Sequence, residues 1–103
     1  MIARVWRGVT PTAKADAYVA YLRRTGLKEY RATEGNKAVV MLRRVRGDEA
    51  EFLLLTFWES YEAIQRFAGE DIEKAVYYPE DEQYLLSMDP SVVNYEVLDD
   101  LRD

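Results

Sequence analysis

Apolar residues are densest in a run from Glu51 to Trp58, Glu-Phe-Leu-Leu-Leu-Thr-Phe-Trp. The aromatic content and the length of this run favour a strand over a helix, although periodicity alone does not decide between them. Successive side chains of a strand point to opposite faces, and here both faces are apolar. Both must therefore be covered. In a chain of 103 residues, two short helical segments can cover one face, so we expect a second copy of the protein to cover the other.

The rest of the pattern predicts three more strands and two main helices. Strands are expected over residues 2–9, 38–45 and 92–98, and the helices after Pro11 and after Ser60. Ser60 is a helix-capping residue, while Gly26 and Gly69 are typical stops at the ends of these helices. A connecting loop is expected over residues 27–36, a short helical stretch over 71–76, and one helical turn with a loop over 80–88.

This order of strand, helix, strand, strand, helix, strand is the β-α-β-β-α-β arrangement of ferredoxin-like α+β folds. In that fold the helices lie on one face of a four-stranded antiparallel sheet, and the other face is left bare. Two such sheets packed face to face form a dimeric α/β barrel, which covers both faces of the run at 51–58. We assign residues 1–98 to this single domain and residues 99–103 to a charged C-terminal tail.

Composition narrows the possible chemistry. The net charge of −5 argues against a nucleic-acid binder, which needs a basic face. No apolar run approaches the roughly 20 residues that cross a bilayer, and no signal-peptide pattern opens the chain, so a cytoplasmic protein that binds no membrane is expected. The sequence contains no cysteine and no histidine. Thiol chemistry, imidazole bases and the usual haem and zinc ligands are therefore excluded, and we expect no cofactor and no metal.

Two charged clusters favour structural interpretations over binding sites. The arginines at 43, 44 and 46 form a dense basic run, which we interpret as a solvated strand edge and turn rather than a phosphate site. The carboxylates between residues 70 and 82 lack the spacing of a calcium loop. Solvated helix starts explain them, because acidic side chains stabilise the first turn of a helix.

Five phrases spread along the chain are more distinctive. They are TFWES at 56–60, IQRFAGED at 64–71, AVYYPED at 75–81, LLSMDP at 85–90 and NYEVL at 94–98. Together they resemble the antibiotic biosynthesis monooxygenase-like family of dimeric α/β barrels, and the resemblance extends from residue 2 to residue 98. It implies the ferredoxin-like fold and a homodimer. It does not fix one activity, because the superfamily includes cofactor-free oxygenases, haem-degrading enzymes and other enzymes.

The sequence departs from the haem-degrading relatives at key positions. Those relatives place an asparagine on the first strand, a tryptophan on the second helix and a histidine soon after it. The corresponding positions here hold Arg7, Phe67 and Tyr77. Without that histidine the chain lacks the nitrogen ligand of haem iron, so haem degradation is not expected. Relatives also commonly have a histidine before the final Tyr-Glu-Val, where this chain has Asn94.

The resemblance implies a pocket between the helix-facing side of the sheet and the helical segments. The residues expected near it are Arg7, Trp58, Phe67, Tyr77 and Tyr78. Aromatic walls with one cation suit a flat, weakly acidic molecule such as a polyphenol or quinol. An arginine favours the ionised phenol, which gives an electron to oxygen more readily than the neutral one. Core packing of the aromatic residues, and a salt bridge for the arginine, are the alternative interpretations.

Arg4 is assigned a structural role, pairing with Glu96 across neighbouring strands inside the dimer barrel. Two hypotheses on function remain. In the first, the protein binds a small molecule and acts as a cofactor-independent monooxygenase, an oxidoreductase that acts on an aromatic or quinol-like ligand. In the second, it is a non-catalytic dimeric module for ligand binding or stress that keeps the fold but not the chemistry. No catalytic residue is assigned in either case.

Overall fold

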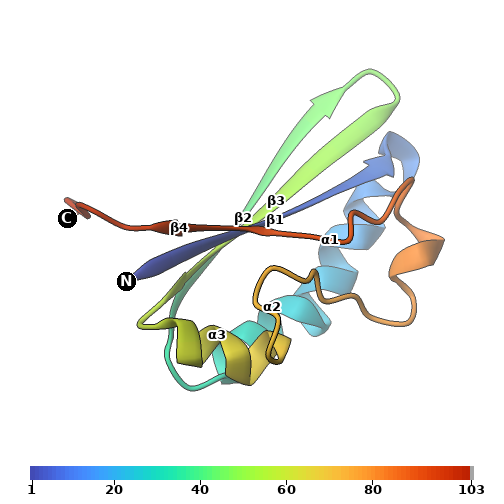
Figure 1. Ribbon diagram of the computed structural model, residues 1–103. Coiled ribbons are helices and arrows are strands. Elements are labelled where there is room, and N and C mark those ends of the chain that lie inside the picture. The colour runs from blue at the N-terminus through green and yellow to red at the C-terminus, as the bar shows by residue number, and fades with distance from the viewer. Residues whose placement is uncertain (103) are drawn as a thin grey trace.

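The computed structural model describes residues 1–102 and shows one antiparallel sheet with helices on one face (Figure 1). The strands are β1 (Ile2–Pro11), β2 (Asn36–Arg46), β3 (Glu49–Trp58) and β4 (Val93–Glu96). The helices are α1 (Ala15–Arg24), α2 (Gly26–Ala32) and α3 (Tyr61–Ala68), with 3-10 turns η1 (Thr12–Lys14) and η2 (Asp81–Gln83). The strand order β2-β3-β1-β4 confirms the predicted ferredoxin-like α+β fold.

The expected boundaries of α3 are confirmed by its capping contacts. The Oγ atom of Ser60 accepts a hydrogen bond from the backbone N–H of Ala63 at 3.2 Å. At the other end Gly69 has a φ of 87°, a conformation that favours glycine and stops the helix. The single helical turn predicted within residues 80–88 is also present, as the 3-10 turn η2.

Two predicted connections are wrong. Residues 27–36 were expected as a loop, but most of them form α2, whose Tyr30 is buried against the core while Leu27 packs beside it. Gly26 begins this helix instead of ending the previous one. Residues 71–76 do not form a helix, because their backbone pairs with a distant segment. The N–H of Ala75 donates to the Pro90 carbonyl, and residue 92 donates to the carbonyl of residue 73.

The alternation of side chains along the strands separates two faces of the sheet. On β3, Phe52, Leu54 and Trp58 point toward the helices and are buried. Leu53 and Leu55 point the other way and are only partly covered. We call this second side the open face. From the strand register it consists of Ala3, Val5, Arg7 and Val9 on β1, Ala38, Val40, Leu42 and Arg44 on β2, Glu51, Leu53, Leu55 and Phe57 on β3, and Val93 and Tyr95 on β4.

Tyrosines dominate the core at one end of the helix layer. The rings of Tyr21 and Tyr84 stack at 5.2 Å, and Tyr18 packs against both. The hydroxyl of Tyr18 donates to Oδ1 of the buried carboxylate of Asp81 at 2.8 Å. The other oxygen of Asp81 accepts from the backbone N–H of Tyr78 at 2.6 Å. This carboxylate therefore anchors the turn after Pro79 to α1.

Alkaline pH is expected to destabilise the fold through Tyr18, Tyr21 and Tyr30. Burial raises the pKa of each of these phenols, whereas in the unfolded chain they ionise near pH 10. Their contribution to stability is therefore complete below about pH 10 and is lost as the pH rises beyond it. The free energy of unfolding should fall by about 1.4 kcal/mol per pH unit for each tyrosine that ionises only when unfolded.

Urea titrations between about pH 8 and pH 11 would measure this loss, which begins where unfolded tyrosines ionise. Absorbance of tyrosinate in the folded protein, recorded over the same pH range, serves as the control for ionisation without unfolding. A urea midpoint that stays constant throughout this range would contradict the expectation.

Candidate functional site

A buried arginine marks the strongest candidate site, on the helix-facing side of β1. Arg4 is only 1% exposed, although a guanidinium stays charged in proteins. Its Nη2 atom donates to the backbone carbonyl of Lys74 at 3.0 Å, and its Cζ atom lies 5.6 Å from the centre of the Phe67 ring. Its Nε and Nη1 atoms have no hydrogen-bond partner among residues 1–102. The guanidinium therefore uses only part of its bonding capacity.

The charge of Arg4 is also uncompensated. Within the described part of the chain, no carboxylate pairs with it; the five ion pairs involve other cations. A charge buried without a partner costs several kcal/mol, by general estimates. Burial lowers the pKa of Arg4 from its usual value, and the neighbouring phenol of Tyr30 partly opposes this shift. A bound anion would balance the charge at this point.

Aromatic rings from three different elements form a cluster, and Phe67 of this cluster lies against the guanidinium. Tyr30 on α2 and Phe67 on α3 pack with ring centres 4.4 Å apart, and Trp58 on β3 lies 6.0 Å from Phe67. The indole N–H of Trp58 donates to the hydroxyl of Thr56 at 2.8 Å, which fixes the ring against the sheet. The structure thus brings together two of the expected pocket residues, Trp58 and Phe67. Their packing also fits the alternative interpretation as core.

Tyr77 and Tyr78 lie on the irregular segment that crosses the helix-facing side of β1. The ring of Tyr77 packs edge-on against Trp6, with centres 6.1 Å apart, and its hydroxyl donates to the carbonyl of Asp89. Burial raises the pKa of both phenols, and the charges of nearby carboxylates add to the shift. Both tyrosines are therefore neutral hydrogen-bonding groups in the folded protein.

Arg7 does not join this cluster. The alternation along β1 places it on the open face, opposite to Arg4. Its Nε atom donates to Glu51 at 2.6 Å, and Glu51 also accepts from Arg44 at 3.0 Å. The two arginines hold the pKa of the Glu51 carboxyl below its usual value, Arg7 having the larger effect. The expected place of Arg7 in the pocket is therefore wrong, and the salt bridge considered as its alternative is present.

The expected pair between Arg4 and Glu96 is also not formed. The register between β1 and β4 sets Glu96 opposite Ile2 and sets Asn94 opposite Arg4. Neighbours in a strand pair share a face, so Asn94 lies beside the buried guanidinium. Its Nδ2 atom donates to the carbonyl of Ile72 at 3.2 Å, while its Oδ1 atom is buried without a partner in the described residues. The site thus offers unpaired donors from Arg4 and an unpaired acceptor from Asn94.

Sequence reasoning missed three residues of this site. Arg4 was assigned to the barrel, and Asn94 was treated only as the loss of a histidine. Tyr30 was placed in a loop, although its spacing of three from Leu27 is that of one helix face. That spacing was the available signal for Tyr30.

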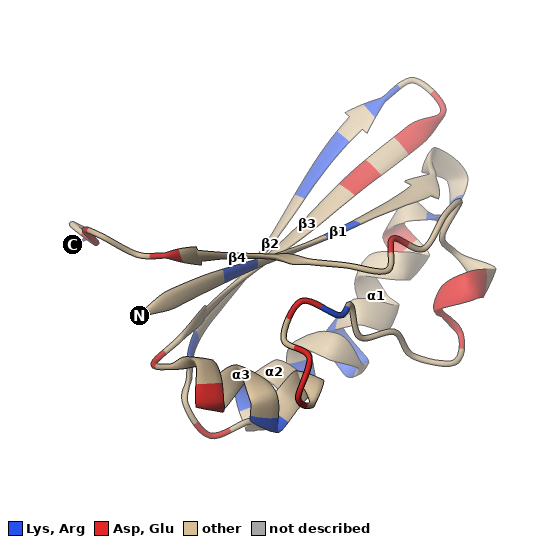
Figure 2. Cartoon of the chain, viewed as in Figure 1, with Lys and Arg blue, Asp and Glu red and all other residues tan. Residues whose placement is uncertain are grey.

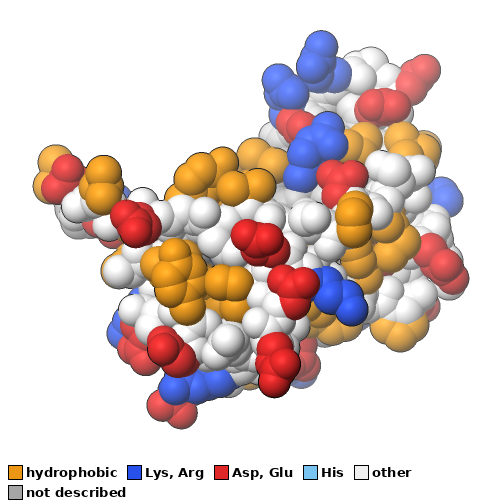
Figure 3. Space-filling model, in the orientation of Figure 1, with side chains coloured by type: hydrophobic (Ala, Val, Ile, Leu, Met, Phe, Trp, Pro, Cys, Tyr) orange, Lys and Arg blue, Asp and Glu red, His pale blue; other side chains and the backbone are white. Residues whose placement is uncertain are grey.

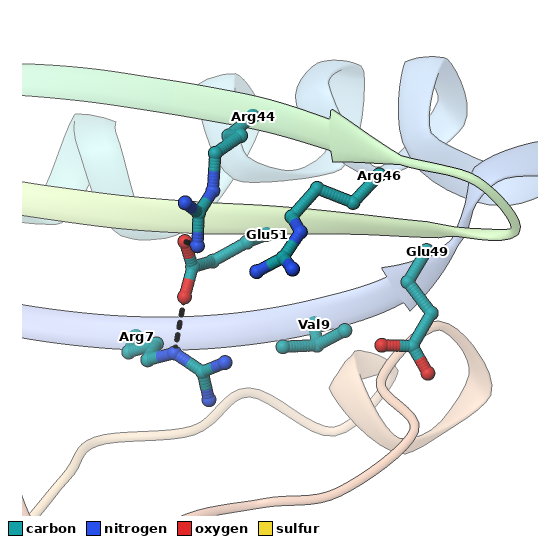
Figure 4. A pocket seen from close by; sticks show the side chains of 6 residues that line it. All are labelled: Arg7, Val9, Arg44, Arg46, Glu49 and Glu51. Carbon is teal, nitrogen blue, oxygen red and sulfur yellow. Dashed lines mark hydrogen bonds and ion pairs between the residues drawn. The ribbon is translucent and has the colours of Figure 1, made fainter.

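Solvent-open cavities gather at the β2–β3 hairpin rather than at Arg4. One cavity of about 420 Å³ opens on the open face, and Figure 4 shows the side chains of Arg7, Arg44 and Arg46 converging on it. A second, of about 420 Å³, lies near Arg43 on the other side of the hairpin, and a third of about 340 Å³ adjoins Leu42. Arg4 itself is buried and lines none of these three cavities.

Solved structures of three proteins match this fold over nearly the whole chain. A Bacillus cereus protein named as an antibiotic biosynthesis monooxygenase has a TM-score of 0.68 at 17% identity, covering 99% of this chain and 97% of its own. The heme-degrader MhuD from Mycobacterium tuberculosis, with two hemes in its active site, has a TM-score of 0.59 at 20% identity and covers 99% and 100%. Rv0793 from the same organism has a TM-score of 0.61 at 19% identity and covers 98% of both chains.

The residues around Arg4 do not fit a haem group. The chain has no histidine, so a tyrosinate would have to bind the iron. Tyr77 is the candidate on the helix-facing side, but its hydroxyl donates to a backbone carbonyl and burial raises its pKa. Both features oppose the ionised phenol that iron needs. A haem group therefore does not fit this site.

No protein-family model and no curated protein sequence matches the chain. No helix among residues 1–102 is long and apolar enough to cross a membrane. At 17–20% identity, the likeness to the solved structures establishes the architecture. The chain therefore has the fold of the antibiotic biosynthesis monooxygenase-like proteins, as the phrases in its sequence predicted.

Proposed function

We propose that this protein binds a small, flat, anionic aromatic molecule at Arg4 and oxidises it with molecular oxygen, without a cofactor. The observation that carries the proposal is the buried guanidinium of Arg4, which has no carboxylate partner among residues 1–102. A phenolate would balance this charge and stack on the rings of Tyr30 and Phe67. The fold shared with a protein named as a monooxygenase supports the same class of reaction.

The proposed chemistry resides mostly in the substrate. Arg4 would lower the pKa of a bound phenol, and the interaction is stronger in a site from which water is excluded. The phenolate can then give an electron to O₂. In the balanced reaction, a ring CH₂ flanked by phenol rings becomes a carbonyl with one oxygen atom, and its two hydrogens leave with the other as water. Asn94 Oδ1 would accept a hydrogen bond from a second substrate hydroxyl and so orient the ring.

Access to Arg4 requires movement of the segment at 69–92. Apart from η2 it has no regular structure. One isolated bridge, between Ser87 and Val9, ties it to the sheet, and a second, between Lys74 and Ser91, joins two parts of the segment itself. The bond from Arg4 to the carbonyl of Lys74 is a further tie between this segment and the sheet. A ligand that takes over this donor would release the segment locally.

The proposed active form is a homodimer, and the open face supports it. Its apolar side chains form a continuous stretch over four strands, with Tyr95 56% exposed and Leu42 44% exposed. Contiguous apolar patches of this kind mark interaction sites. A second copy applied to the same face would cover both patches symmetrically.

Oxygen uptake with a panel of reduced polycyclic phenols tests the proposed reaction. We expect uptake that depends on the protein, and a fall of about 100-fold or more in Arg4→Met, since a charged hydrogen bond and its counter-ion are lost together. Lys28→Met removes an exposed charge from α2 and is the matched control, expected to retain activity.

Quenching of tryptophan fluorescence reports binding separately, because Trp6 and Trp58 both lie on the helix-facing side of the sheet. Binding without oxygen uptake across the panel would favour the non-catalytic ligand-binding module. The burial of Arg4 is the observation that favours this second hypothesis. If the protein showed no ligand binding and no oxygen uptake, the proposed function would be contradicted.

A further inference from the structure

We infer that an acidic segment of one copy docks in an arginine-lined cleft of a second copy. The acidic segment is residues 96–102. The arginine-lined cleft is the cavity of about 420 Å³ on the open face, lined by Arg7, Val9, Arg44, Arg46, Glu49 and Glu51. The inference rests on the proposed homodimer and states which ends of the two sheets meet.

The arginine-lined cleft carries an excess of positive charge. Three arginines and two glutamates line it. Glu51 already accepts hydrogen bonds from Arg7 and Arg44, whereas Arg46 has no ion pair within the described residues (Figure 4). A second copy that covers the open face would remove this cleft from water. Arginines removed from water need hydrogen-bond acceptors or counter-ions, and the partner would have to supply these groups.

The acidic segment has the complementary chemistry. It contains three carboxylates and one cation. Asp100 pairs with Arg102 at 2.7 Å, which leaves Glu96 and Asp99 without an ion pair in the described residues. Leu98 is 84% exposed and Leu101 is 90% exposed. Figure 2 shows acidic positions on the chain beyond β4, and Figure 3 shows acidic and apolar side chains extending there from the body of the molecule. The segment therefore offers both charges and apolar groups to a partner.

The segment is held beside the open face rather than against the helices. The N–H of Val97 donates to the carbonyl of Met1 at 3.0 Å, which continues the pairing of β4 with β1. The guanidinium of Arg102 lies 5.0 Å from the ring centre of Phe57, a residue of the open face. A copy packed on this face would therefore meet the segment directly.

The two features lie at opposite ends of the same sheet. The register sets Pro11 opposite Glu49 at the hairpin end, and sets Ile2 opposite Glu96 at the other end. At about 3.3 Å per residue, roughly 30 Å of strand separates these ends. In the structure, the acidic segment extends beyond β4 at the end of the sheet remote from the hairpin, away from the arginine-lined cleft of its own chain.

Two ways of packing the open faces together differ in their electrostatics. If the hairpin ends met, the arginines of one cleft would face those of the other, and like charges would repel. If each hairpin end met the far end of the partner, each cleft would receive an acidic segment. The second arrangement is favoured because it pairs opposite charges twice in a symmetric dimer.

Cross-linking tests this arrangement directly, because the chain has no cysteine of its own. The double variant Arg46→Cys with Asp99→Cys should form a covalent dimer with a short thiol cross-linker. Arg46→Cys alone should stay uncross-linked, since the two hairpins do not meet. A covalent dimer from Arg46→Cys alone would overturn the inference. So would a double variant that stays uncross-linked while sedimentation shows it to be dimeric.

Charge exchange supplies a second measurement. Arg46→Glu or Asp99→Lys alone should weaken the dimer about tenfold, and the two together should restore wild-type affinity within about threefold, because a swapped pair is again complementary. Lys28→Glu and Glu62→Lys make the same charge changes on α2 and α3, and neither should weaken the dimer. Single and double variants with equal affinities would overturn the docking. A monomeric wild type would overturn the homodimer itself, while oxygen uptake would still test the proposed reaction separately.

Discussion

Arg4→Met is expected to stabilise the protein while it abolishes binding of an anionic ligand. Methionine has a similar length and no charge, so it removes the cost of burying an unpaired guanidinium. It also leaves the carbonyl of Lys74 without its donor and loses the contact with Phe67, each worth about 1 kcal/mol. Relief of the buried charge exceeds these losses by general estimates. The net gain should be about 1 kcal/mol, or about 4–8 °C in Tm.

Thermal unfolding and ligand titration of the same sample check both halves of this expectation. Arg4→Lys is the companion variant, because it keeps the charge but not the planar donor set. We expect it to gain no stability and to bind weakly. A fall in Tm for Arg4→Met would instead assign the arginine to the core, and unchanged ligand affinity would remove it from the binding site.

Leu55→Lys is expected to convert the proposed dimer into a monomer. Leu55 lies at the centre of the open face, with Val5 and Val40 as its neighbours on the adjoining strands. In a face-to-face dimer, each copy would bury one ammonium group among apolar side chains, at a cost of several kcal/mol. Two such groups should raise the dimer Kd by about 1,000-fold or more. In a single copy the lysine can reach water, so the fold should persist.

Sedimentation velocity over a range of concentrations measures this change, with circular dichroism as the check on the fold. Val45→Lys is the matched control. It places the same side chain on the helix-facing side of β2, where Val45 is already 53% exposed. That variant should remain dimeric. If Leu55→Lys dimerised as tightly as the wild type, the open face would not be the interface.

The fold was predictable because side chains along a strand alternate between two faces, and because helix caps depend on residues close in sequence. The run at 51–58 and the Ser60 cap each depend on residues close in sequence, and both predictions are confirmed. The segments at 27–36 and 71–76 depend on distant partners. Residues 72, 75 and 76 have helical spacing, but the N–H of residue 75 donates to residue 90 and the carbonyl of residue 73 accepts from residue 92. Tertiary pairing therefore overrode the local pattern.

The site was predictable only in part, for a related reason. Alternation shows that Arg4 and Arg7 point to opposite faces, but it does not show which face the helices cover. The burial of Ile2 and Trp6 decides this, and it places Arg4 rather than Arg7 among the aromatic rings. Trp58 and Phe67 were named from the family resemblance; alternation alone does not single them out, because the aromatic residues Phe57 and Tyr95 lie on the open face.

The irregular course of the chain between α3 and β4 sets a limit on how fast a ligand could reach Arg4. Few backbone hydrogen bonds hold residues 69–92, so this part of the protein should open locally at a lower free energy than global unfolding requires. Binding would then follow opening. The observed rate of association would stop rising at high ligand concentration, because the frequency of opening rather than diffusion would determine it.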